Sequence, residues 1–176
     1  NINTYNLEYW KEPNLSNCYL AGNIGADGCL IEKDGRYSLC LLVAEKDQCM
    51  IDNYIRELNF SGSKRIRKNT SFPGQKQNYC CYLRFSAFKK NSEYLKQYFN
   101  IVPQKTHRLG PTNLNNNYLN LAYLMGYWDG DGTICVSISK KWNYKNLSFS
   151  CVSCSRAIMD WMKEMIDRNF SIDSNR

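Results

Sequence analysis

The chain has 176 residues, a formal net charge of +7 at pH 7 and a hydrophobic share of 43%. This length allows one substantial core or two small half-domains, and the positive charge favours a polyanionic partner such as a nucleic acid. No apolar run approaches the length that crosses a bilayer and no signal peptide is visible, so the composition argues against a membrane protein.

The first hundred residues predict an alternation of helices and strand pairs. Ser16 is a suitable N-cap for the first helix, Asp34 and Gly35 favour a tight turn, and Pro73 and Gly74 favour a loop. The expected elements are a helix over about 17–26, strands over 29–32 and 36–43, a helix from about 47, strands over 63–70 and 79–87, and a helix over 92–100. The helix from about 47 carries a core stripe at helical spacing, formed by Met50, Ile51, Tyr54, Ile55 and Leu58.

The same order begins again after a Pro- and Gly-containing linker. We expect a helix over about 118–129, strands over 133–139 and 146–152, and a helix capped by Ser155. The chain ends soon after this last helix, so the second round lacks the further strands and helix of the first. The predicted organisation is a first half-domain over 1–102, a linker over 103–117 and an incomplete second half-domain over 118–176.

The two helices that open these halves share one design. Residues 20–28 read LAGNIGADG and residues 124–132 read LMGYWDGDG, and their acids lie 104 positions apart (131 minus 27). Small residues allow two helices to pack with their backbones close together, and the final glycine of each stretch allows a left-handed C-cap. A pairing of these helices about an approximate two-fold axis would bring Asp27 and Asp131 side by side.

Two carboxylates held that close repel each other, so one takes up a proton unless a cation lies between them. Hard divalent cations such as Mg²⁺ prefer carboxylate oxygen. On a basic protein, a metal-bridged acid pair suits the cleavage of a phosphodiester. Both stretches resemble the signature of the LAGLIDADG homing endonucleases, in the form in which one chain carries two motifs.

This resemblance implies an α/β (α+β) fold of two pseudo-symmetric half-domains. Their antiparallel sheets would pack through the central helix pair and form a saddle that binds DNA. The resemblance also implies that Asp27 and Asp131 are catalytic metal ligands, joined by backbone carbonyls beside Ala26 and Gly130. Asp129 has a glycine at the equivalent place in the first motif, so we expect it to act as a helix-end or packing residue.

The resemblance assigns two further roles near the acids. A polar residue at the end of the second strand lies near the attacking water in this family, and Glu45 falls there in the first half. Cys154 falls at the equivalent place in the second half, where a thiol positions water poorly. A basic residue would stabilise the phosphate charge, and Lys105 is the best match.

Basic residues on the strands and at one hairpin tip predict the nucleic-acid contacts. Strand alternation places Arg65 and Arg67 on one sheet face, with Tyr82 and Arg84 of the neighbouring strand facing the same groove. Such a row suits a DNA major groove. Lys64 and Lys68 fall on the other face, and a basic tip suits phosphates and an unstacked RNA base. The tip residues are Lys140, Lys141, Trp142 and Lys145.

The nine cysteines do not form a disulfide framework. Their odd number makes complete intramolecular pairing impossible. Cys151 and Cys154 have the spacing of two metal ligands, but no second pair and no nearby histidine completes a zinc site. We therefore expect reduced thiols, most of them buried as small hydrophobes.

Two functions from different classes remain open at this point. The first is a metal-dependent double-strand DNA homing endonuclease encoded in an organellar intron. The second is a catalytically inactive relative that binds structured RNA, either as a mitochondrial ribosomal protein on rRNA beside other ribosomal proteins or as a group I intron maturase. A DNA-binding regulator on the same scaffold is a third. The abundance of Asn, Tyr and Lys is typical of AT-rich coding genomes, so we expect a mitochondrion or another organelle.

Overall fold

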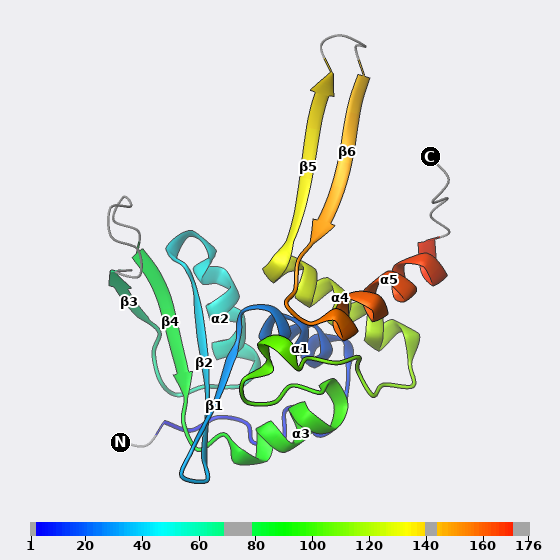
Figure 1. Cartoon of the computed structure of the whole chain (residues 1–176). Helices are drawn as coiled ribbons and strands as arrows, with labels where there is room; N and C mark the ends of the chain where they lie inside the picture. The colour runs from blue at the N-terminus through cyan, green and yellow to red at the C-terminus, as the bar shows by residue number, and fades with distance from the viewer. Residues whose placement is uncertain (1–2, 69–78, 140–143, 171–176) are drawn as a thin grey trace.

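The computed structural model describes residues 3–68, 79–139 and 144–170 (Figure 1). These residues form five α-helices, one four-stranded sheet and one two-stranded sheet, and every strand pairing is antiparallel. The predicted mixed fold of helices and antiparallel sheets is therefore confirmed. Within the described ranges, no helix has the length and hydrophobicity needed to cross a membrane.

Two motif helices, α1 (Leu15–Asp27) and α4 (Asn117–Asp131), pack against each other at the centre of the molecule (Figure 1). The prediction that Ser16 caps α1 is wrong. Asn14 is the cap, because its side chain accepts from the Asn17 N–H at 3.0 Å and the Asn17 side chain accepts from the Asn14 N–H at 2.8 Å. This reciprocal capping box starts the helix two residues earlier than predicted, and the Ser16 hydroxyl donates to Glu57 instead.

Glycines at equivalent positions allow the close approach of α1 and α4. A Cβ built on Gly22 would lie 2.6 Å from the backbone nitrogen of Tyr127, and one on Gly126 would overlap the carbonyl of Tyr19. The backbones themselves are therefore in contact, as the small residues of both motifs predict. No larger residue fits at either position unless the helices move apart.

The predicted left-handed caps at the ends of these helices are wrong. Gly28 and Gly132 are both extended, with φ/ψ of −76°/149° and −89°/157°. Each helix runs directly into a strand, and a strand requires extended backbone. Glycine is still needed there for space, because a Cβ on Gly28 would lie 2.8 Å from the Ile24 Cα.

The four-stranded sheet has the order β1-β2-β4-β3, and helices cover one of its faces. The predicted turn at Asp34 and Gly35 is confirmed, since both residues have positive φ between the first two strands. The strands are β1 (Cys29–Lys33), β2 (Arg36–Ala44), β3 (Arg65–Lys68) and β4 (Tyr79–Phe85). The covering helices are α2 (Gln48–Glu57), which follows a short 3-10 turn (Glu45–Asp47), and α3 (Lys89–Phe99). The loop predicted at Pro73 and Gly74 lies outside the described residues.

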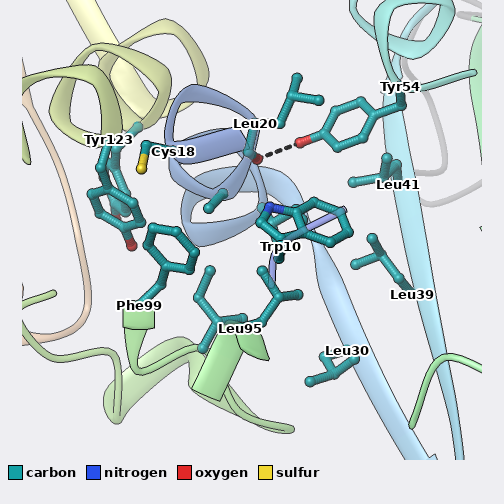
Figure 2. Close-up of a cluster of buried hydrophobic side chains, with 14 of the residues drawn as sticks. Trp10, Cys18, Leu20, Leu30, Leu39, Leu41, Tyr54, Leu95, Phe99 and Tyr123 are labelled. Carbon is teal, nitrogen blue, oxygen red and sulfur yellow. Dashed lines mark hydrogen bonds between the residues drawn. The ribbon is translucent and has the colours of Figure 1, made fainter. Parts of the chain in front are cut away.

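The hydrophobic core lies between α1 and the first sheet (Figure 2). Trp10 is fully buried there, and its indole N–H donates to the Asn17 carbonyl at 3.1 Å. The Tyr54 hydroxyl donates to the Leu20 carbonyl at 2.6 Å, which ties α2 to α1 (Figure 2). The predicted α2 stripe is confirmed, because Ile51, Tyr54 and Leu58 are fully buried.

The second round continues from α4 into β5 (Gly132–Ser139), β6 (Tyr144–Cys151) and α5 (Arg156–Phe170). The β5–β6 hairpin projects away from the first sheet and from the helices (Figure 1). Ser155 precedes α5 as predicted, but its buried hydroxyl donates to the Leu109 carbonyl at 2.6 Å. Its side chain therefore holds the linker, which contains a short 3-10 turn (Lys105–His107).

All nine cysteines are free thiols, as expected. The prediction that most of them are buried is wrong. Only Cys18, Cys80 and Cys81 are buried, while the exposed ones are Cys29, Cys49, Cys135 and Cys154. Cys135 lies on β5 of the second hairpin, where its neighbours Ile134 and Val136 are exposed as well.

Candidate functional site

The ends of α1 and α4 bring Asp27 and Asp131 together. The Asp27 Oδ2 lies 2.8 Å from the position of a Cβ built on Gly130, so this carboxylate rests against the last turn of α4. Loss of solvation raises the pKa of Asp27, and the negative charges of Asp131 and then Asp47 raise it further. Negative charge is therefore concentrated around Asp27, and this favours a cation nearby.

Lys105 supplies a positive charge from the linker. Its Nζ donates to the carbonyl of Gly25 at 2.6 Å and to the carbonyl of Ala26 at 3.0 Å, in the last turn of α1. Burial lowers the pKa of Lys105, while the charges of Asp131 and Asp27 oppose that change. The lysine predicted to lie near the acids therefore lies there, although sequence patterns did not reveal its carbonyl partners.

The Asp131 side of the acid pair opens into a pocket of about 310 Å³. Asp131 and Lys105 line it together with Ser153 and Cys154, at the start of the segment that joins β6 to α5. The pocket has room for a phosphate group. Cys154 thus lies where the family resemblance expects a water-positioning group, but it offers a thiol.

The Asp27 side opens into a separate pocket of about 520 Å³. Its acids are Asp27, Asp47 and Asp129, and it is bounded by the end of β2. Glu45 is exposed and does not line this pocket, because the 3-10 turn after β2 directs the chain so that Asp47 faces Asp27 instead. A strand-end prediction cannot foresee this turn, so the sequence did not single out Asp47.

Asp129 has a packing partner across the helix pair. The Tyr19 hydroxyl donates to the Asp129 Oδ2 at 2.6 Å, and the pKa of Tyr19 is raised to about 12 by burial and by this carboxylate. The bond joins α1 to the end of α4. Asp129 therefore packs at the helix end, as we expected because the first motif has a glycine at the equivalent position.

The donor atoms around the acid pair are oxygens. No group of three or more His, Cys, Asp and Glu side chains within residues 3–68, 79–139 and 144–170 is placed to hold a metal ion. A cation here would rely on Asp27 and Asp131 together with backbone carbonyls. Carboxylate and carbonyl oxygens suit hard divalent cations such as Mg²⁺ and Ca²⁺, so the residues present fit such an ion.

The outer face of the first sheet carries the predicted basic row. Arg65 pairs with Tyr82 across β3 and β4, and Arg67 lies on the same face with its guanidinium 4.6 Å from the Tyr82 ring centroid. Arg84 shares this face through strand alternation and donates to the Ser38 hydroxyl at 3.1 Å. We call Arg65, Arg67, Tyr82 and Arg84 the arginine face. It is exposed except for the half-buried Tyr82.

The arginine face continues toward the acids. Leu42, the β2 partner of Tyr82, lies on that face and lines the Asp27 pocket with Ala44. Lys64 and Lys68 fall on the opposite side of the strand, as predicted. Lys64 donates to both carboxylate oxygens of Asp52 at 2.6 and 2.7 Å, so its charge is paired.

The predicted basic tip is described only in part. Lys140, Lys141 and Trp142 lie outside the described residues. Lys145 is exposed and pairs with Ile138, so it lies on the same hairpin face as the apolar side chains of β5. Ser148 and Ser150 lie on the other face of the hairpin, so Lys145 does not join them.

Comparisons with known proteins give partial likenesses. No family model matches the chain. An uncharacterised protein of Methanocaldococcus jannaschii, MJ0314, is 27% identical over 154 residues, which cover 84% of this chain and 52% of that protein. The crystal structure of the LAGLIDADG homing endonuclease I-GzeII in complex with its DNA target is similar with a TM-score of 0.45 and 14% identity, over 78% of this chain and 65% of that one. The chain thus spans about half the length of MJ0314 and about two thirds of the length of the endonuclease.

Proposed function

We propose that this chain is a nucleic-acid-binding protein of the LAGLIDADG type that cleaves double-stranded DNA with the help of a divalent cation. The observation that carries the proposal is the pair of carboxylates at adjoining helix ends, beside a sheet face that bears three arginines. The likeness of both motif stretches to the family signature supports it.

Each part of the site has a separate task in this proposal. The arginine face binds phosphates and guanine edges of the duplex, and Asp27 and Asp131 hold the cation together with carbonyl oxygens. When bound, Mg²⁺ supplies positive charge that stabilises the negative charge developing on the phosphodiester. Lys105 adds a positive charge at the pocket beside Asp131.

Cleavage by matched variants tests the catalytic part. Duplexes that bind the full chain in Ca²⁺ are selected from a randomised library and incubated with Mg²⁺. We expect D27N and D131N each to cleave at least about 100-fold more slowly than wild type. D129N is the control, because Asp129 lies on the same helix end but bonds to Tyr19. Cleavage at the wild-type rate by D27N would contradict the proposal.

Binding by face-specific variants tests the nucleic-acid part. R65A/R67A removes two charges from the arginine face, so we expect about tenfold weaker duplex binding and a salt dependence reduced by about two ions. K68A removes a charge from the opposite face of the same strand and is the control. An equal loss per charge removed in the two variants would show that only net charge matters.

A second candidate is RNA binding without cleavage, which the thiol at Cys154 favours. Cys154 lines the Asp131 pocket where catalysis would need a water-positioning group. In this case the arginine face binds structured RNA such as the rRNA of an organellar ribosome or a group I intron. Tight binding of structured RNA with no duplex cleavage in Mg²⁺ would favour this function over the first.

A further inference from the structure

We propose that Lys105 is a tethered cation that competes with a divalent metal ion for the carbonyl oxygens at the end of α1. The inference extends the metal-binding part of the proposed function and assigns a regulating role to one linker residue. It concerns metal affinity, so it does not depend on which nucleic acid the protein binds.

Lys105 contacts the last turn of α1. The last carbonyls of a helix have no partner within the helix, and here the Gly28 N–H bonds to Ile24 at 3.1 Å. Because Gly28 is extended, no left-handed cap returns to the helix end. The carbonyls of Gly25 and Ala26 both accept from one ammonium, at 2.6 and 3.0 Å.

The charge around that ammonium comes from two acids. Asp131 and Asp27 both stabilise the charged form of Lys105, with Asp131 the stronger of the two. Lys105 is therefore surrounded by two carbonyl oxygens and the field of two carboxylates. This set of oxygens is the one that a hard divalent cation would use here.

The Lys105 ammonium and a divalent metal ion would exclude each other from this site. An ammonium and a divalent ion that share carbonyl oxygens would lie within a few ångströms in a half-buried site, where like charges repel strongly. Lys105 also lines the pocket beside Asp131 and has a flexible four-carbon stem. A lysine displaced from the carbonyls would therefore move toward the place where a phosphate fits.

Calorimetric titration of the full chain with Ca²⁺ and Mg²⁺ tests the competition. We expect K105M to bind Ca²⁺ at least about tenfold more tightly than wild type, because the competing charge is gone. K96M is the matched control, since Lys96 lines neither acid pocket and its removal changes net charge equally. We expect K96M to change the affinity by less than about threefold.

Weaker or unchanged Ca²⁺ binding by K105M relative to K96M would overturn the proposal, as would the absence of Ca²⁺ binding by all three proteins. Tighter binding by K105M with no DNA cleavage would support the competition while contradicting the proposed nuclease.

A second measurement uses only the wild-type chain, in case K105M does not fold. Lysines are acetylated briefly with and without Ca²⁺, and each site is quantified by mass spectrometry. We expect Ca²⁺ to raise the labelling of Lys105 severalfold and to leave Lys96, outside the acid site, unchanged. Protection of Lys105 by Ca²⁺, or unchanged labelling, would overturn the proposal.

Discussion

The two halves of the molecule begin with the same kind of helix and hairpin but differ in what covers the hairpin. Leu30 and Leu39 are paired in the first hairpin, and Ile134 and Phe149 are paired at the equivalent place in the second. Leu39 is fully buried, whereas Phe149 is 60% exposed. The first hairpin belongs to a four-stranded sheet under helices, while among the described residues the second forms a sheet of only its own two strands. The two motif helices are therefore followed by hairpins that have equivalent pairing but different burial.

The second half is instead held by its helices. Ile158, Met162 and Met165 of α5 are buried in the same core cluster as Tyr123 of α4. One face of β5–β6 is apolar and exposed, with residues Ile134, Val136, Ile138, Leu147 and Phe149. We infer that α1, α4 and α5 stabilise this half and that the hairpin contributes little.

The two halves also differ in the side chains around the acid pair. Asp27 faces a second acid, Asp47, from the first half, whereas Asp131 faces Lys105 and Cys154. The two carboxylates are equivalent in sequence, but different side chains line the pockets beside them. Variants in the helix pair test what the two halves share. Variants in one half alone test how the halves differ.

The largest effect is expected where the two halves are alike. G22A and G126A each force a Cβ into the backbone of the partner helix, so we expect each to lose about 4 kcal/mol of unfolding free energy or to fail to fold. Urea unfolding followed by tryptophan fluorescence measures this. G110A is the control, because its Cβ would have its nearest neighbour at 3.6 Å. A loss below about 1 kcal/mol in G126A would show that the close approach is not needed.

The next effect tests where the halves differ. L39A removes a fully buried side chain and is expected to cost about 3 kcal/mol. F149A removes an exposed one at the equivalent place and is expected to cost less than about 1 kcal/mol. Both are measured by urea unfolding. Equal costs would mean that the apolar face of the second hairpin is covered in solution.

A smaller effect concerns the bond between the linker and the second half. S155A deletes the buried hydroxyl that donates to the Leu109 carbonyl, so we expect a loss of about 1–2 kcal/mol. S148A removes an exposed hydroxyl from the second hairpin and should change stability by less than about 0.5 kcal/mol. If S155A matches S148A in urea unfolding, the linker does not need this bond.

The smallest effect is the repulsion at the acid pair. The folded-state pKa of Asp27 is raised, so its charge lowers stability above that pKa and the penalty disappears as pH falls toward the ordinary value. We expect D27N to melt at a higher temperature than wild type at pH 7.5. The difference should shrink as the pH approaches about 4. A difference that stays constant over this range would contradict the raised pKa.

Local patterns were sufficient for most elements of the first half. The α2 stripe, the turn at Asp34 and Gly35 and the strand alternation that gathers the arginine face all depend on neighbours a few residues apart. The repeated motif also predicted that α1 and α4 meet and deliver Asp27 and Asp131 to one place. The cap at Asn14 was missed, because two asparagines compete well with a single serine.

By itself, the sequence determined the paired motif helices, their acids and the mixed fold, since periodicity and small residues act locally and are repeated. Only the tertiary structure decided that Lys105 bonds to carbonyls 80 and 79 positions away. It also decided that Asp47 rather than Glu45 faces Asp27 and that the second hairpin remains uncovered. These features depend on how distant segments meet, and a contact between distant segments leaves no periodic pattern in the chain.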